Sequence, residues 1–129
     1  MKYKLTKKTR KLGSITLFQI KALIDTKYCK KGELGGFIEN KKNLAQDRDA
    51  WVSGNARVSG NALVSGNARV YGNALVSGNA GVSGNAQVYG DAGVSGRFDL
   101  TVNCNFVLKK ITIDTKEKLK KLKDFLDSF

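Results

Sequence analysis

A six-residue pattern of apolar and polar positions runs through the middle of the chain from Ala50 to Arg97, as in Ala-Arg-Val-Ser-Gly-Asn at 56–61. Alanine stands first and valine third in every hexad. Because residues two apart point to the same side of an extended strand, each hexad predicts a very short strand with one apolar face. A period of six does not keep these residues on one side of a 3.6-residue helix. The inward positions are Ala50, Ala56, Ala62, Ala68, Ala74, Ala80, Ala86 and Ala92, with Val52, Val58, Val64, Val70, Val76, Val82, Val88 and Val94.

Glycine and asparagine end most hexads, with Asp91 in place of asparagine in the seventh and Arg97 in the eighth. Gly and Asn adopt left-handed backbone angles more readily than other residues, so the pair predicts a corner after each strand. Three strands and three corners would close a triangular coil of about 18 residues, with coils stacked about 4.8 Å apart. A single coil buries little apolar surface, so the stability of such a prism must come from stacking.

The six-residue phase extends beyond the hexads in both directions. Ile38 and Leu44 lie in phase with Ala50, which predicts that coiling begins near residue 38. Downstream, larger side chains are expected at the Ala and Val positions, where they would close the bottom of the prism: Phe98, Leu100, Cys104 and Phe106. At Lys110 the phase fails, and Ile111 and Ile113 carry the apolar character after a slip of one residue.

The two ends of the chain predict different elements. Residues 1–37 contain the strand-like runs KYKLT and SITLFQIKALI, followed by a turn at KKGELGG, and we interpret them as a small β-cap. The final stretch, TKEKLKKLKDFLDSF, has apolar residues at helical spacing and predicts an amphipathic helix from about Thr115. The organisation expected is one domain with a cap at 1–37, a coil region at 38–108 and a terminal strand and helix at 109–129.

The eight unbroken hexads resemble the hexapeptide-repeat family, whose members form a left-handed parallel β-helix. The stretch ALIDTKYCKKGELGGFIENKKNLAQDRDAWVSGNARVSG is also similar to a group of small phage and bacterial proteins that share a GxLGGxIE…NL…AWV lead-in. The resemblance implies an all-β fold, a left-handed parallel β-helix with the cap and the C-terminal helix added. The family habit of forming trimers implies a homo-oligomer, a trimer or a dimer.

The chemistry of that family depends on histidine, and this chain has none. Family acyltransferases use a histidine base and others bind zinc through histidines, so neither activity can run here in its usual form. The cluster of Glu33, Glu39, Asp47 and Asp49 is interpreted as solvated acids, with an acyltransferase that uses a non-histidine base kept as a minor alternative. We therefore expect no enzyme activity, no cofactor and no metal site.

The net charge and its distribution along the chain indicate the kind of partner more clearly than the rest of the composition does. The chain has 23 Lys and Arg against 11 Asp and Glu, a net charge of +12. Residues 1–49 alone hold thirteen cationic and five acidic residues, whereas residues 50–97 hold three and one. Such a surplus favours an acidic partner, although lysine can also serve only to keep a repeat protein soluble. The predicted partner-binding residues of the cap are Lys2, Lys4, Lys7, Lys8, Arg10 and Lys11.

A second candidate surface follows from the vertical stacking of residues 18 apart. It gathers aromatic and polar side chains on one outer face: Trp51, Arg69, Tyr71, Gln87 and Tyr89. Aromatic and Arg residues commonly anchor binding surfaces and stack on nucleic-acid bases. The competing interpretation is that Tyr71 and Tyr89 stack on each other and only join adjacent coils.

Two classes of function remain. The first is a non-catalytic phage-type protein whose basic cap binds nucleic acid or a nucleoprotein, of which an inhibitor of a bacterial defence system, such as an anti-CRISPR, is one version. The second is an oligomeric structural spacer of a phage assembly. No apolar run approaches the roughly 20 residues of a membrane span. Cys29 and Cys104 show no metal-ligand spacing, which favours reduced thiols and a location in the cytoplasm of a bacterial host.

Overall fold

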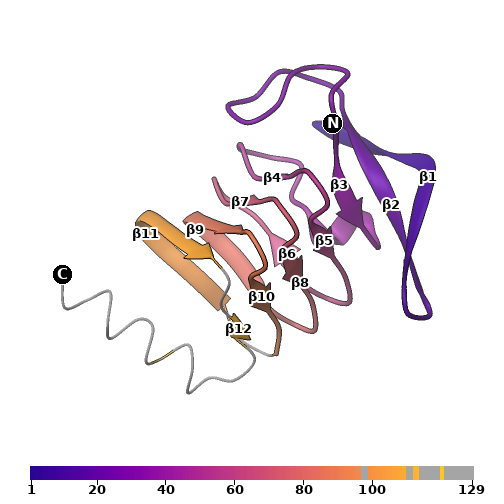
Figure 1. Cartoon of the computed structure of the whole chain (residues 1–129). Helices are drawn as coiled ribbons and strands as arrows, with labels where there is room; N and C mark the ends of the chain where they lie inside the picture. The colour runs from indigo at the N-terminus through magenta and orange to yellow at the C-terminus, as the bar shows by residue number, and fades with distance from the viewer. Residues whose placement is uncertain (97–98, 110–111, 114–119, 121–129) are drawn as a thin grey trace.

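The computed structural model describes residues 1–96, 99–109, 112–113 and 120, and for 99–109 and 112–113 it describes the backbone only. Parallel coils occupy the middle of the chain, and an antiparallel cap covers one end (Figure 1). The elements are β1 (Tyr3–Leu12), β2 (Ile15–Ala22), β3 (Leu34–Ile38), a 3-10 turn η1 (Lys41–Asn43), β4 (Trp51–Val52), β5 (Arg57–Val58), β6 (Leu63–Val64), β7 (Arg69–Val70), β8 (Leu75–Val76), β9 (Gly81–Tyr89), β10 (Gly93–Val94), β11 (Asp99–Lys109) and β12 (Thr112–Ile113).

The hexads stack as a β-solenoid of about 3 turns. Strands β5, β8 and β10 pair in parallel, and so do β4, β7 and the second half of β9. The third stack joins β6 to the first half of β9. In all of these pairs the register joins residues 18 apart, as in Arg57 with Leu75. The period of six in the sequence therefore becomes three vertical stacks of very short strands.

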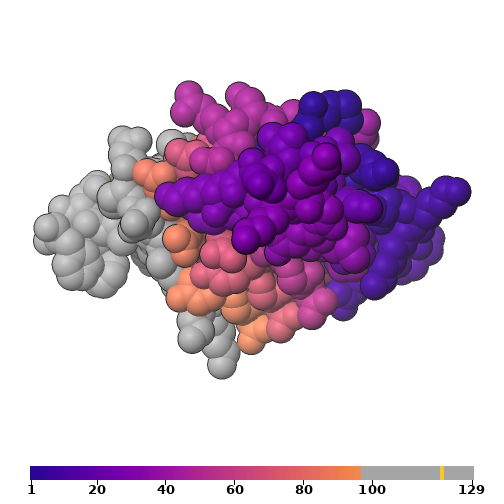
Figure 2. Space-filling view, turned by 90° about the horizontal axis from the view of Figure 1, so that it is seen from above, coloured from indigo at the N-terminus to yellow at the C-terminus, as the bar shows by residue number. Residues whose placement is uncertain are grey.

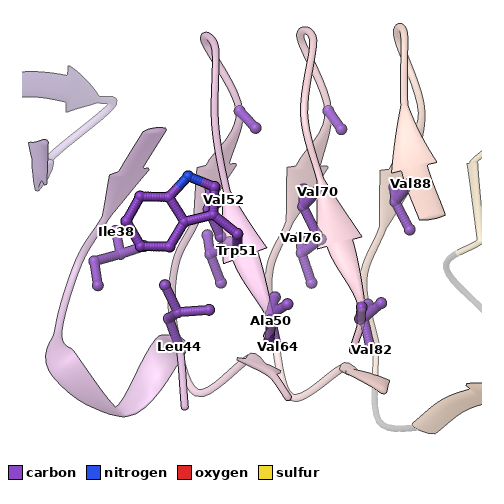
Figure 3. Packing of buried hydrophobic residues seen from close by; sticks show 14 of the residues in the cluster. Ile38, Leu44, Ala50, Trp51, Val52, Val64, Val70, Val76, Val82 and Val88 are labelled. Carbon is purple, nitrogen blue, oxygen red and sulfur yellow. The ribbon is translucent and has the colours of Figure 1, made fainter. Parts of the chain in front are cut away.

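The interior of the solenoid is built from the predicted alanines and valines. Every Ala and Val at the first and third hexad positions is buried, none more than 1% exposed. Figure 3 shows the valines stacked in columns, with Ile38 and Leu44 continuing them toward the cap. Burying a valine side chain stabilises the fold by about 1.5–3 kcal/mol, so the columns supply the main apolar contribution.

Glycine alone makes the corners. Each corner glycine has a positive φ, such as 64° at Gly54 and 70° at Gly72, whereas no hexad asparagine does. The sequence prediction that Asn shares the left-handed geometry is therefore wrong. A backbone bond from Ala56 N to Ser53 O, at 3.2 Å, closes the turn, and only the first central residue of such a turn needs the positive φ. Asn55 instead donates its backbone N–H to Gly72 O of the next coil.

The entry coil is two residues longer than the hexad period predicts. Ile38 pairs with Val58, and Leu44 with Val64, so both occupy Val positions rather than the expected Ala positions. The two extra residues lie between Leu44, whose partner is Val64, and Trp51, whose partner Arg69 is again 18 residues away. Within it, Arg48 adopts a φ of 56°, the one positive φ found outside glycine in the described residues. Because the shift is by two, the side chains stay on the inner face.

The cap is the antiparallel β1–β2–β3 sheet, which joins the solenoid through the parallel pair β3–β5. The predicted turn at KKGELGG is too long, since Leu34, Gly35 and Gly36 already belong to β3. These two glycines are needed for close packing. A Cβ on Gly35 would lie 2.6 Å from Ile20 Cγ1, and one on Gly36 would lie 2.7 Å from Val52 Cγ1.

The far end departs from the predicted phase. Leu100 pairs with Val82 as expected, but the register then slips by two, so Phe106 pairs with Ala86 and Leu108 with Val88. Cys104 lies within this irregularity and does not take the expected Ala position. Ile113 pairs with Val94, consistent with the predicted slip after Lys110. Phe98 and the predicted C-terminal helix lie outside the described residues, apart from Lys120, which is exposed.

Candidate functional site

Five of the six predicted basic residues of the cap are exposed along β1: Lys4, Lys7, Lys8, Arg10 and Lys11. Lys2 is the exception, because it is only 1% exposed. Its Nζ donates to Ala50 O at 2.5 Å and to Asp47 O at 3.4 Å, and burial lowers the pKa of its ammonium. Lys2 therefore fastens the cap to the entry coil, and its prediction as a partner contact is wrong.

Strand β1 lies at the edge of the seven-stranded sheet, and Figure 1 shows the β1–β2 hairpin projecting from the coils. The register of β1 against β2 shifts between Leu5 and Thr9. At this irregularity the Thr6 hydroxyl donates to Gln19 O at 2.8 Å and accepts from Lys8 N at 3.3 Å. Edge lysines and bulges both discourage pairing with another strand, so this edge favours side-chain contacts over strand addition.

The acidic residues of the cap and the entry coil form no ion pairs with these lysines in the part of the chain that the structure describes. Four carboxylates accept hydrogen bonds from backbone N–H groups instead, and among the described residues no side-chain ion pair is formed. The bonds run from Lys31 N to Asp25, from Lys30 N to Glu33, from Lys27 N to Asp49 and from Gly60 N to Glu39, at 2.7–3.3 Å. Lys11 Nζ donates to Thr16 Oγ1 at 2.6 Å, and the described structure gives Lys4, Lys7 and Lys8 no side-chain partner.

The aromatic face is present, but Trp51 is not an exposed part of it. Trp51 pairs with Arg69 and Arg69 with Gln87, so the predicted column is confirmed. However, Trp51 is 0% exposed, with the Tyr3 ring edge-on at a centroid distance of 6.4 Å. Its prediction as an exposed anchor is wrong, because the sequence pattern does not reveal that the cap covers this part of the first coil.

Tyr71 and Tyr89 stack directly on each other. Their ring centroids are 4.9 Å apart and the ring planes differ by 4°. The Tyr71 hydroxyl also lies 3.4 Å from Gln87 Oε1. This contact joins adjacent coils, as the competing interpretation expected, and it leaves both side chains only partly exposed.

A loop that sequence reasoning missed lies against the aromatic face. The β2–β3 loop, residues 23–33, brings Tyr28 to Arg69, whose guanidinium carbon is 5.3 Å from the Tyr28 ring centroid and 4.4 Å from that of Tyr71. Figure 2 shows this part of the chain lying across the coils. The loop also carries three exposed lysines, Lys27, Lys30 and Lys31. In the sequence, the grouping of these lysines around Tyr28 was the one indication that this loop could take part in binding.

Two surface pockets accompany these features. One of about 570 Å³ is formed by the β2–β3 loop, between Thr26 and Glu33. The other, of about 330 Å³, lies beside Leu63 and Gly81 on the third stack of strands. In the ranges that the structure describes, no group of three or more metal-ligating His, Cys, Asp or Glu side chains is found. Cys29 is a buried free thiol 3.1 Å from Thr26 Oγ1.

A family model described as the YdcK beta-solenoid repeat matches the chain over residues 50–66, 56–69 and 68–84. Together with the stacked coils, these matches support the interpretation of residues 50–84 as β-solenoid repeats. No curated protein matches the chain. Within the described residues, no helix has the length and apolar character that crossing a membrane requires.

Proposed function

We propose that this protein is a non-catalytic binding protein whose basic cap engages nucleic acid, free or within a nucleoprotein. The observation that carries the proposal is the row of exposed cations on β1, none of which forms an ion pair within the described residues, although Lys11 Nζ donates to Thr16 Oγ1 and Arg10 lies over the Phe37 ring. Phosphates along a nucleic-acid strand offer regularly spaced charge to such a row, and binding releases counterions. The nearly neutral solenoid serves as the rigid support for the cap.

The proposal also includes the handedness of the coil and the place where the protein acts. We propose a left-handed coil of the hexapeptide-repeat type with about 18 residues per turn, and a bacterial cytoplasmic site of action. The resemblance of the lead-in to phage proteins supports an accessory role, of which inhibition of a bacterial defence system, such as an anti-CRISPR, is one form. A crystal structure with right-handed coils would contradict the proposed handedness.

The test compares two pairs of exposed lysines that carry the same charge. Lys7→Ser with Lys8→Ser removes two cations from β1, and Lys41→Ser with Lys42→Ser removes two from η1. Binding of a fluorescein-labelled oligonucleotide is measured by anisotropy over a series of salt concentrations. Each lost phosphate contact should reduce the log–log salt slope by about 0.7–0.9, so the β1 pair should reduce it by about 1.5.

The control pair should leave the slope unchanged. Equal effects of the two pairs would mean that only net charge matters, and no binding at low salt would overturn the proposal. Binding to a purified nucleoprotein but not to its free nucleic acid would show that the protein component is the partner. Acetyl transfer to an amine or sugar acceptor above background would contradict the non-catalytic assignment.

A second candidate function is an oligomeric structural spacer, and one feature of the third stack favours it. Leu63 is 41% exposed, and its neighbour in register is Gly81, which leaves the 330 Å³ recess. A projection and a recess on one face allow a two-fold related copy to exchange them, which is the condition for an isologous contact. The described lining residues of the recess are uncharged, with Lys42 Nζ at Asn61 Oδ1 as the cation at its edge, so two copies could meet there with little charge repulsion.

The exposed leucine of the cap provides a matched control. Leu63→Arg should abolish self-association in sedimentation equilibrium, whereas Leu34→Arg, at a position 53% exposed, should not. A wild-type protein that stays monomeric over the whole concentration range would remove this candidate. Association of the Leu63→Arg variant would place the contact elsewhere.

A further inference from the structure

Arg69 is held between two aromatic rings on the outside of the solenoid. Tyr28 comes from the β2–β3 loop and Tyr71 from the same coil as Arg69, with guanidinium-to-centroid distances of 5.3 and 4.4 Å. Tyr71 in turn stacks on Tyr89. A planar guanidinium stacked on rings in this way loses little conformational freedom when it binds, because its orientation is already set.

The guanidinium of Arg69 is also notable for its hydrogen-bond donors. Among the described residues no hydrogen bond or ion pair reaches the Arg69 side chain, and its Nε is buried without a partner. The neighbour in register, Gln87, directs Oε1 to the Tyr71 hydroxyl. Arg57 shows the usual alternative, since its Nη2 lies 3.4 Å from Asn73 O although its Nε is also unpaired. Within the described part of the chain, Arg69 is thus an oriented cation without an anionic partner.

Among the described residues, no carboxylate forms an ion pair with Arg69. The loop that supplies Tyr28 carries Lys27, Lys30 and Lys31, and Lys27 Nζ lies 5.5 Å from the Tyr28 ring centroid. Asp49, Glu33 and Asp25 accept hydrogen bonds from the backbone N–H groups of these three lysines and keep their charges, so Arg69 differs from its surroundings in its orientation rather than in an excess of positive charge. An entering oxyanion would meet a fork of N–H donors with three ammonium groups on the adjoining loop.

We propose that Arg69, clamped by Tyr28 and Tyr71, receives a phosphate oxyanion of bound nucleic acid, and that the β2–β3 loop supplies further phosphate contacts. This inference rests on the proposed function but places a second contact surface on the solenoid, apart from β1. The fork of two N–H donors is the feature that distinguishes this contact, since lysine would give charge without bidentate geometry. A phosphodiester is favoured over a carboxylate because the unpaired cations lie on two separate surfaces, as an extended polyanion requires.

The experiment exchanges arginine for lysine at two matched positions, so that net charge stays constant. Arg69→Lys should weaken binding of the labelled oligonucleotide about tenfold while leaving the salt slope unchanged, since the charge remains and the fork is lost. Arg57→Lys is the control and should bind as the wild type does. Tyr28→Leu, which removes one side of the clamp without changing charge, should weaken binding in the same direction.

The source of the oxyanion is separated by competition. Inorganic phosphate should displace the oligonucleotide only weakly, because a single phosphate engages one of many contacts. Polyglutamate that binds as tightly as the oligonucleotide, with the same loss in Arg69→Lys, would overturn the phosphate assignment in favour of an acidic protein. Tighter binding of the oligonucleotide supports the assignment.

The outcomes also separate this inference from the proposed function. If the Lys7 and Lys8 variant loses affinity but Arg69→Lys does not, the clamp only fastens the loop and the inference fails alone. If the wild type binds no oligonucleotide at low salt, both fail. Should Arg69→Lys not fold, ¹⁵N NMR of the wild-type Arg69 Nε–H decides the matter. A shift of this resonance on oligonucleotide titration supports the contact, and an unchanged resonance under saturation contradicts it.

Discussion

The coils and the cap of this protein are held together in different ways. In the coils, the same three features recur in every hexad: buried Ala and Val, a glycine corner with positive φ, and backbone bonds to the next coil. In the cap, only the parallel β3–β5 pair continues the backbone pairing, and a few long-range side-chain hydrogen bonds add to the connection. The Tyr3 hydroxyl donates to Leu44 O and Lys41 O, and Gln46 Oε1 accepts from Lys2 N.

This difference means that the residues that stabilise the fold are largely distinct from the residues that carry its positive charge. Repetition spreads the free energy of folding of the coils over many equivalent contacts between neighbours, which needs almost no charged residues. The cap can then carry an excess of lysines on an exposed edge, since its attachment uses Lys2, Tyr3 and the entry coil rather than the lysines of β1. Four predictions test this division.

The largest effect is expected in the coil interior. Val70→Asp places a carboxylate at a fully buried position without a partner, and should cost more than about 4 kcal/mol of unfolding free energy. Asn79→Asp introduces the same charge at an exposed corner and should change it by less than about 0.5 kcal/mol. Thermal and urea unfolding followed by circular dichroism measure both. Equal stability of the two variants would contradict the assignment of the inner face.

Glycine corners should be less tolerant in the coils than in the cap. Gly72 and Gly13 both have positive φ, 70° and 61°, so alanine costs about 1–2 kcal/mol of backbone strain at either site. At Gly72 the new Cβ would also lie 2.9 Å from Gly90 N, whereas nothing lies within 4 Å at Gly13. Gly72→Ala should therefore be the more destabilising change in urea unfolding. The reverse order would mean that corner stacking contributes little.

Tyr3→Phe tests the attachment of the cap. Loss of the hydroxyl leaves two carbonyl groups, Leu44 O and Lys41 O, without this donor and should cost about 1–3 kcal/mol near neutral pH. Unfolding free energies of the wild type and the variant are compared in urea at a series of pH values. A stability difference below about 0.5 kcal/mol at neutral pH would show that the cap is held elsewhere.

The same comparison has a defined pH dependence. Burial raises the pKa of Tyr3 from 10.0 to about 12. A raised folded-state pKa means that the contribution is complete below pH 10 and is lost as the pH rises from about 10 through about 12. The advantage of the wild type over Tyr3→Phe should therefore shrink in this window. An advantage that stays constant to pH 12 would contradict the buried placement of the hydroxyl.

The smallest effect on stability is expected for the lysines of β1. Lys7→Ser with Lys8→Ser alters only exposed side chains and should change the unfolding free energy by less than about 0.5 kcal/mol. The same variant should nevertheless lose affinity for an oligonucleotide. A large loss of stability would show that these lysines support the cap, and the separation of stability from charge would then fail.

Much of the candidate surface could be predicted from the sequence, because it follows from the six-residue period and from the number of cationic residues in each region. The columns of Arg69 with Gln87 and of Tyr71 with Tyr89 follow from adding one coil to each residue number. The concentration of cations before the hexads is visible in the sequence itself. The clamp of Tyr28 on Arg69 was out of reach, since it joins segments about forty residues apart that share no pattern.

By itself, the sequence determined the face on which each hexad residue lies, since a period of six with side chains alternating every second residue leaves Ala and Val on the same side. It also determined the corners, because repeated Gly supplies the positive φ. Only the tertiary structure decided where the period breaks and what covers the outer face. The longer entry coil, the burial of Lys2 and Trp51, and the docking of the β2–β3 loop all depend on contacts between distant segments, whose free energies no local pattern records.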